Sequence, residues 1–106
     1  MRPISFIEPP FFVDYGSHTR VGRAFYANHN LVILDAAPVT IGDHVFIGPN
    51  CCISTAGHPF DVAQRNAGLE YAKPVTIGNN VWIGMGVQIC PASPSVITPS
   101  SAQAAL

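Results

Sequence analysis

One sixteen-residue pattern occurs twice in the chain and constrains its fold more than any other feature. PVTIGDHVFIGPNCCI covers residues 38–53, and PVTIGNNVWIGMGVQI covers residues 74–89. Isoleucines recur every six residues in each copy, and a second small apolar residue stands two positions before each isoleucine. A helix needs apolar residues every 3.6 residues and a long strand needs unbroken alternation, so a period of six fits neither. It fits short strands joined by glycine-containing corners, which predicts a parallel β-helix of hexapeptide units.

The predicted inward side chains are the isoleucines of the two copies and their apolar partners. They are Ile41, Ile47, Ile53, Ile77, Ile83, Ile89, Val39, Val45, Cys51, Val75, Val81 and Val87. An earlier coil with the same spacing is expected at Val21, Phe25, Ala27, Leu31 and Ile33. The next step is eight residues long, so residues 35–38 are expected to bulge at a corner.

The repeat divides the chain into three parts. Residues 1–20 hold several prolines and phenylalanines and are expected to form an irregular lead-in or cap. Residues 21–91 are expected to form the β-helix, interrupted by a loop over residues 54–73 that has no period. Residues 92–106 lack the repeat. Because long excursions from rigid scaffolds often carry function, the loop is the first place to look for a site.

Composition narrows the function classes. A chain of 106 residues with 48% hydrophobic residues is expected to form one domain with a core. Only 10% of its residues are charged, against roughly 25% in ordinary soluble domains, which predicts a covered surface and therefore an oligomer. The net charge of -1 and the lack of a basic patch argue against a nucleic-acid partner. No apolar run approaches the roughly 20 residues that span a membrane, and no signal-like start is visible, so the expected compartment is the cytoplasm.

The three cysteines do not form a disulfide or metal pattern. Cys51 and Cys52 are adjacent and point to opposite faces of a strand, and the third stands alone. Cys51 falls on the inward register, where it is expected to fill the core. No metal is expected.

Three ordered motifs give the chain a family resemblance. They are FYANHNLVILDAAPVTIGD, TAGHP and KPVTIGNNVWIG, and the similarity extends over roughly residues 9–91. The chain resembles the hexapeptide-repeat sugar O-acetyltransferases, which include galactoside and maltose acetyltransferases. The resemblance implies an all-β, left-handed parallel β-helix that acts as a homotrimer and moves acetyl from acetyl-CoA to a sugar hydroxyl. The hand comes from the resemblance alone, because most parallel crossovers are right-handed.

The catalytic histidine of the family matches His58 in TAGHP. A neutral imidazole within hydrogen-bond reach can take the proton of a sugar hydroxyl as it attacks the thioester. The alternative is a surface histidine that caps a turn before proline. The other histidines, His18, His29 and His44, do not match the motif, and no set of three ligand histidines is evident.

The resemblance also implies a sugar-binding group of Asp14, Tyr26, Asn28 and Asp35. Amides and carboxylates suit a polyol. The alternatives are a turn-forming role for Asp14 and an inward asparagine ladder for Asn28. Ala36 stands where one branch of the family has a second acid, which favours the maltose type over the galactoside type.

Three more residues are candidates through the resemblance. Glu70 either orients His58 or is solvated. Trp82 is expected to flank the pantetheine arm of the cofactor or to pack in the trimer. Met85 replaces a residue that is usually small in the family and would narrow the cofactor channel.

Both ends depart from the family pattern. The family has a helical segment before the β-helix and further coils with CoA-binding basic residues after it. Residues 92–106 are what a family-like continuation would encode after loss of one guanine, so we interpret the tail as a frameshift product of a truncated enzyme with weak or no activity. A genuine divergent cap is the alternative for the tail. A catalytically dead remnant and a non-enzymatic interaction module are the alternatives for the function.

Overall fold

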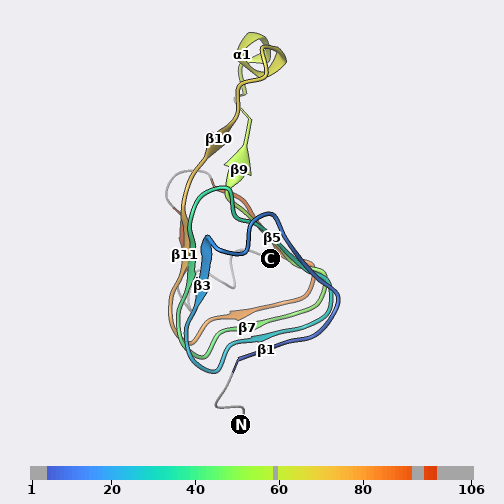
Figure 1. Cartoon of the computed structure of the whole chain (residues 1–106), viewed down its shortest axis with the longest axis vertical. Helices are drawn as coiled ribbons and strands as arrows, with labels where there is room; N and C mark the ends of the chain where they lie inside the picture. The colour runs from blue at the N-terminus through green and yellow to red at the C-terminus, as the bar shows by residue number, and fades with distance from the viewer. Residues whose placement is uncertain (1–4, 59, 92–94, 98–106) are drawn as a thin grey trace.

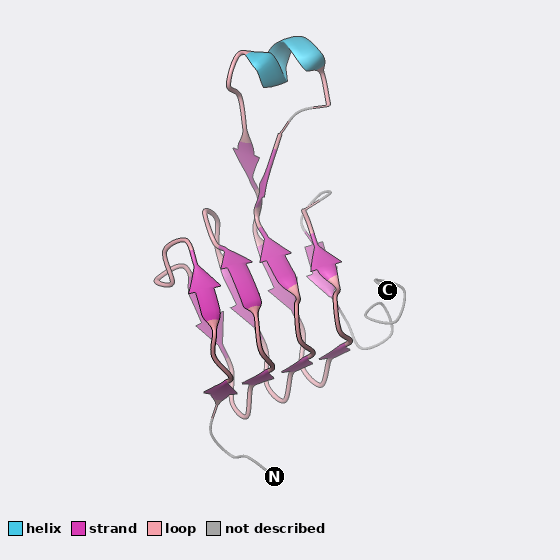
Figure 2. Ribbon diagram, turned by 90° about the vertical axis from the view of Figure 1, so that its right-hand side faces the viewer, coloured by secondary structure: helices cyan, strands magenta, loops and turns pink. Residues whose placement is uncertain are grey.

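The structure is a computed structural model that describes residues 5–58, 60–91 and 95–97, the last of these by their backbone alone. Its chain winds through successive coils of three short strands, and equivalent strands of each coil pair in parallel. Three four-stranded sheets result, which form the three faces of a triangular prism (Figure 1). Figure 2 shows the coils stacked side by side along the prism. The predicted parallel β-helix is therefore confirmed.

Each face takes one strand from each coil. The first face, in spatial order, consists of β1 (Phe6–Ile7), β4 (Tyr26–Ala27), β7 (Phe46–Ile47) and β12 (Trp82–Ile83). The second face consists of β2 (Phe11–Val13), β5 (Leu31–Leu34), β8 (Cys52–Ser54) and β13 (Gln88–Ile89). The third face consists of β3 (Thr19–Val21), β6 (Val39–Ile41), β11 (Val75–Ile77) and β14 (Ser95–Ile97). Each corner is named below by the two faces that it joins.

The sequence repeat becomes a repeat in space. Val39 pairs with Val75, and Ile53 pairs with Ile89, so each residue stacks on its equivalent in the next coil. All of the predicted inward side chains of the two copies are buried, the most exposed being Ile89 at 5%. Within each strand, successive side chains point alternately into and out of the prism. The alternation ends at each corner and starts again in the next strand. Two inward residues per unit are enough to fill the narrow prism.

The N-terminal segment differs from the expectation of an irregular lead-in. Strands β1 and β2 pair in parallel with β4 and β5, so the first coil begins at Phe6. The prolines at positions 9 and 10 stand at the corner between these strands, where no ladder hydrogen bond is needed. Val21 points inward but is 41% exposed, because no coil in the described part of the chain lies below it.

The tail also departs from the expectation of a segment without repeat structure. Strand β14 pairs in parallel with β11, with Ser95 beside Val75 and Ile97 beside Ile77. At least this part of the tail continues the third face. The rest of the predicted tail, residues 92–94 and 98–106, lies outside the described residues, and the frameshift interpretation remains a prediction.

The predicted loop is confirmed as an excursion from the β-helix. It rises from the second–third corner as an antiparallel ribbon of β9 (Ala56–Gly57) and β10 (Tyr71–Ala72), topped by α1 (Val62–Asn66) (Figures 1 and 2). The Asp61 carboxylate caps α1 by accepting from the Gln64 backbone N–H at 2.9 Å. The helix buries none of its residues. No helix in the described part of the chain has the length and apolar character to cross a membrane.

The third–first corner shows how the coils lock together. Ala24, His44 and Asn80 occupy the same place in three successive coils, and each has a positive φ of 55° to 59°. The Asp43 carboxylate accepts from the Arg23 backbone N–H in the coil below, at 2.8 Å. The Asn79 side-chain oxygen does the same for the Asp43 N–H, at 2.7 Å. Side-chain oxygens thus satisfy backbone donors that a tight corner would otherwise leave unpaired.

Candidate active site

His58 lies directly after β9, near the root of the excursion, and its side chain is exposed. Its Nδ1 lies 3.3 Å from the backbone carbonyl oxygen of Leu69 on the other side of the ribbon. A carbonyl oxygen only accepts, so Nδ1 carries the proton and donates it. In the neutral ring, Nε2 then has the lone pair. An imidazole in this tautomer is ready to accept a proton from a bound hydroxyl.

Glu70 was expected either to orient His58 or to be solvated, and its exposed side chain agrees with the solvated alternative. It is exposed, and the hydrogen bond recorded for His58 Nδ1 goes to the backbone of the preceding residue, Leu69. The ribbon brings this carbonyl across from His58, because Gly57 pairs with Tyr71. A backbone carbonyl leaves no mark in the sequence, so the sequence pointed to the neighbouring acid.

Asp35, which was predicted to belong to the sugar-binding group, has a structural role within the single chain. Its side chain is fully buried at the second–third corner. One carboxylate oxygen accepts from the Tyr15 N–H at 2.8 Å, and the other accepts from the Gly16 N–H and the Thr19 hydroxyl at 2.9 Å each. Its own carbonyl contacts His18 Nδ1 at 2.7 Å. Both oxygens of the carboxylate therefore hold the turn of the coil below and do not face a ligand.

The charge on Asp35 reflects this environment. Burial by itself would raise the pKa of the carboxyl group, but the hydrogen bonds from Tyr15, Thr19 and Gly16 oppose it. The balance lowers the pKa of Asp35 below its ordinary value of 3.8. The carboxylate is thus ionised at neutral pH and acts as an anionic acceptor for three donors.

Asp14 lies at the same corner as the excursion. It follows β2, its backbone N–H donates to the Ile33 carbonyl at 3.2 Å, and its side chain is exposed. The excursion leaves the β-helix two coils further on, after β8. At a strand spacing of about 4.8 Å, two coils correspond to roughly 10 Å along the prism. Asp14 and His58 therefore belong to one edge of the molecule.

Asn28 lies at the first–second corner, at the opposite end of the second face, and Tyr26 lies on the first face two residues before it. Tyr26 points outward from the first face, and its hydroxyl donates to Glu8 at 3.0 Å. Asn28 is half-buried at the first–second corner, and its side-chain oxygen accepts from the His29 N–H at 2.7 Å. An asparagine pair forms next to it on the surface, where the amide of the exposed Asn30 donates to Asn50 at 2.9 Å.

The predicted site residues therefore fall into two groups within one chain. Asn28 and the excursion with His58 are separated by the whole second face (Figure 1). That face is four residues wide at β5, which corresponds to roughly 13 Å at 3.3 Å per strand residue. A single copy does not bring the amide of Asn28 to the imidazole of His58.

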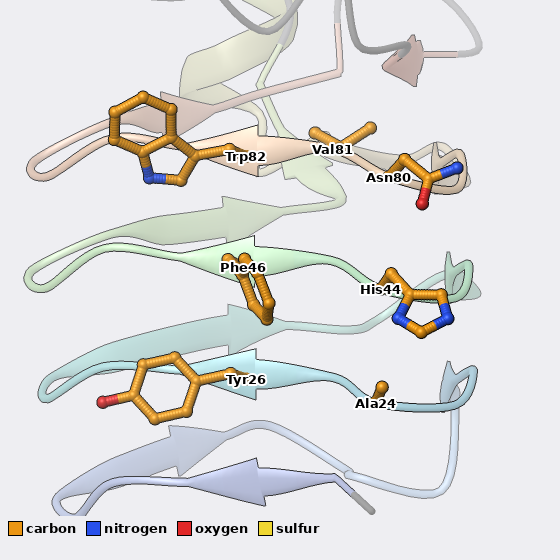
Figure 3. A pocket seen from close by; sticks show the side chains of 7 residues that line it. All are labelled: Ala24, Tyr26, His44, Phe46, Asn80, Val81 and Trp82. Atoms are coloured by element: carbon orange, nitrogen blue, oxygen red, sulfur yellow. The ribbon is translucent and has the colours of Figure 1, made fainter. Parts of the chain in front are cut away.

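An open depression of about 920 Å³ lies on the first face (Figure 3). Outward aromatic side chains from three successive coils form one side of it, and the third–first corner forms the other. It is lined by Ala24, Tyr26, His44, Phe46, Asn80, Val81 and Trp82. The Tyr26 and Phe46 rings meet edge to face with centroids 6.4 Å apart, and Trp82 is 74% exposed. Such a concave, mostly apolar surface is typical of ligand and protein contacts.

Phe46 is a residue of this depression that the sequence analysis missed. It pairs with Tyr26 on one side and Trp82 on the other, and it is 50% exposed. The signal was present, because aligning the two repeats places VFIG under VWIG. Met85, at the first–second corner after β12, is 75% exposed and packs its backbone against Gly48, where an added Cβ would lie 2.8 Å from the Met85 nitrogen.

The described residues hold no cluster of three or more side chains suited to a metal ion. Cys51 is 2% exposed and its thiol donates to the Gly84 carbonyl at 3.1 Å, which confirms it as a core residue. Burial raises the pKa of the Cys51 thiol and that of the half-buried Cys52 thiol. Both thiols are therefore protonated and unreactive at neutral pH.

Comparison with known proteins places this geometry in a family. A model described as the hexapeptide repeat of succinyl-transferase matches residues 38–57 and 65–90. A Saccharomyces cerevisiae protein, provisionally named as an acetyltransferase, is 69% identical over 85 residues, which are 80% of this chain and 43% of that protein.

Solved structures agree with these matches. A galactoside acetyltransferase in complex with coenzyme A superposes with a TM-score of 0.80 and 49% identity, over 89% of this chain and 49% of its own. A maltose O-acetyltransferase from Clostridium difficile 630 has a TM-score of 0.78 and 48% identity, over 83% of this chain and 46% of its own. This chain thus spans less than half the length of these relatives. The expected left-handed hexapeptide β-helix is confirmed, and so is the predicted resemblance of the chain to the hexapeptide-repeat acetyltransferases.

Proposed function

We propose that the protein transfers an acetyl group from acetyl-CoA to a hydroxyl group of a sugar, with His58 as the general base. The observation that carries the proposal is the 3.3 Å contact between His58 Nδ1 and the Leu69 carbonyl, which favours the proton on Nδ1 of the neutral ring. The exposed Nε2 is then a free acceptor beside solvent. The similarity to galactoside and maltose acetyltransferases supports a sugar as the acceptor.

The proposed reaction is a single acyl transfer. His58 Nε2 takes the proton of the sugar hydroxyl while the hydroxyl oxygen attacks the carbonyl carbon of the thioester. The carbon–sulfur bond then breaks, the acetyl ester forms, and the imidazolium returns its proton to the leaving CoA thiolate. A positioned base of this kind contributes roughly 10²–10⁴-fold to the rate.

Tyr26, Asn28 and Asp14 are the proposed sugar contacts. All three present polar atoms at or beside corners, and the ring of Tyr26 adds an apolar face. Trp82 and Met85 are the proposed contacts of the pantetheine arm, since both are largely exposed and Trp82 lines the depression of the first face. Coenzyme A in the similar galactoside acetyltransferase supports this choice of acyl donor.

We further propose that the working unit is a homotrimer in which each site is shared by two copies. The two groups of site residues lie on different corners of one chain, so the excursion of one copy must approach the first face of the next. Phe60, Val62 and Leu69 on the excursion are 97%, 57% and 51% exposed, and the first face offers an apolar depression. The excursion and the first face are two different surfaces, so each copy would bind the next one head to tail. Such contacts form a closed ring of three copies when each copy is rotated by a third of a turn relative to the last.

The proposed compartment is the cytoplasm. All three cysteines are free thiols, although Cys90 is exposed and Cys52 is half-buried. Free thiols are typical of a reducing environment.

The test is an acetyl-transfer assay with acetyl-CoA and maltose or a galactoside. His58→Ala is expected to lower kcat by roughly 10²–10⁴-fold without changing the circular dichroism spectrum. Gln64→Ala is the matched control, because Gln64 is an exposed residue of the same excursion. Equal rates for His58→Ala and the unmodified chain would remove His58 from the reaction. Sugar or acetyl-CoA binding without turnover would favour a dead remnant, and binding of neither would favour an interaction module.

A further inference from the structure

The excursion is attached to the β-helix almost entirely through its root. None of the described residues from 56 to 74 is buried, and α1 contributes nothing to the core. Packing therefore does not fix how the ribbon stands on the prism. Within one copy of the chain, the direction in which His58 points from the β-helix depends on the few contacts where the excursion leaves it.

Thr55 provides these contacts. It is fully buried at the second–third corner, between β8 and β9. Its hydroxyl donates to the Leu34 carbonyl at 2.7 Å and accepts from the Ala37 N–H at 3.0 Å. Its backbone N–H also donates to the Leu34 carbonyl, at 3.0 Å. One side chain thus ties the departing strand to two sides of the corner in the coil below.

Thr55 also closes the ribbon. Its carbonyl accepts from the Lys73 N–H at 2.9 Å, where the chain returns to the β-helix. This pair continues the register in which Ala56 faces Ala72 and Gly57 faces Tyr71. The outgoing and returning strands are therefore joined at the residue whose hydroxyl is anchored to the prism.

The next step of the ribbon transmits this anchor to His58. The Tyr71 ring lies against Gly57, where an added Cβ would meet the ring at 2.5 Å. The Lys73 ammonium group lies 5.0 Å from the centre of the same ring. Gly57 directly precedes His58, so the imidazole stands three residues from Thr55 on a packed ribbon.

We propose that Thr55 is a positioning residue, whose buried hydroxyl aims the excursion and thereby places His58 for the transfer reaction. The expected effect on kcat rests on the proposed function. The expected effect on the orientation of the excursion does not. A hydroxyl is required because the site must both donate to Leu34 and accept from Ala37. Valine has the same shape but can do neither, and it would leave the Ala37 N–H without its acceptor.

The structural test measures residual dipolar couplings of backbone amides by NMR in full-length Thr55→Val, Thr55→Ser and Thr40→Val. Thr40→Val is the matched control, since Thr40 is exposed on β6. One alignment frame is expected to fit the β-helix and the excursion in the unmodified chain, Thr55→Ser and Thr40→Val. In Thr55→Val the couplings of β9, α1 and β10 are expected to shrink or to require another frame, while those of the three faces stay unchanged.

The kinetic test uses the same variants. Thr55→Val is expected to lower kcat by up to roughly 10²-fold, as a misplacement of about 1 Å can do, with KM for acetyl-CoA within about twofold. Thr55→Ser is expected to restore kcat. Unchanged couplings in Thr55→Val, or failure of Thr55→Ser to restore them, would overturn the proposal. Should Thr55→Val fail to fold, Thr55→Ala leaves room for water at the two backbone groups and serves as the second variant, under the same criteria. If the unmodified chain transfers no acetyl group, the proposed function fails, while the couplings still decide the role of Thr55.

Discussion

The stacked coils and the excursion are built on opposite principles. In the coils, every described strand pairs with an equivalent strand, and the inward residues form one continuous core. The excursion has a two-residue ribbon and a five-residue helix, and it buries no residue beyond its root. Stability is therefore concentrated in the coils, whereas the proposed base stands on the part of the chain that contributes least to it. Such a division is typical of functional loops on rigid scaffolds.

Replacing a core residue of the coils should give the largest effect. Ile47→Asp places a charge without a partner among buried side chains, since Ile47 is 1% exposed. We expect a loss of about 4 kcal/mol or more in the free energy of unfolding. Urea unfolding followed by circular dichroism measures it. The control on the excursion is Ala63→Asp, which should change stability by less than about 0.5 kcal/mol because Ala63 is exposed on α1 and packs against no core residue. Similar losses of stability for the two variants would refute the view that stability is concentrated in the coils.

Asp35 provides a test of intermediate size, because it stabilises a corner of the coils through its charge. Asp35→Asn should cost about 1–3 kcal/mol at pH 7, since an amide replaces an anionic acceptor of three hydrogen bonds. The pKa of Asp35 is lower in the folded chain than its ordinary value of 3.8. Its contribution is therefore fully present above about pH 4 and is lost as the pH falls through the lower folded pKa.

Unfolding curves measured between pH 7 and pH 2 check this dependence. The unmodified chain should lose stability below about pH 4 more steeply than Asp35→Asn, in which the group no longer titrates. Identical pH profiles for the two proteins would show that the Asp35 charge does not stabilise the coils.

The cap of α1 should give the smallest effect on global stability. Asp61→Ala removes the oxygen that accepts from the Gln64 N–H, which typically costs a helix about 1 kcal/mol. Because α1 packs against no core residue, we expect the midpoint of urea unfolding to stay unchanged. Amide hydrogen exchange in residues 64–67 should speed up, while exchange in the three faces should not. A shifted unfolding midpoint would mean that the excursion and the coils unfold as one unit.

The sequence predicted the coils well because their rules are local. Each hexapeptide has its own inward pair and its own corner, so positions such as Ile41 and Ile77 were identified without knowledge of any partner. The errors fell where the period was weak. Phe6 to Val13 and Ser95 to Ile97 lack a visible repeat but pair with neighbouring coils, because an existing strand edge accepts any backbone of suitable alternation.

The candidate site was predicted by residue type and not by arrangement. The motif identified His58, but its proton is positioned by a backbone carbonyl that no motif contains. Asp35 looked like a ligand contact and is a buried anchor. Phe46 became part of a surface only when its coil was stacked between those of Tyr26 and Trp82.

By itself, the sequence determined the hexapeptide period, the inward residues, the place of the excursion and the histidine that it carries. These follow from short-range alternation and from residues that are neighbours in the chain. Only the tertiary structure decided the partner of His58 Nδ1, the anchoring of Thr55 and the separation of Asn28 from His58 on two corners. Each of these depends on hydrogen bonds or distances between residues far apart in the sequence, and such contacts exist only after the coils have stacked.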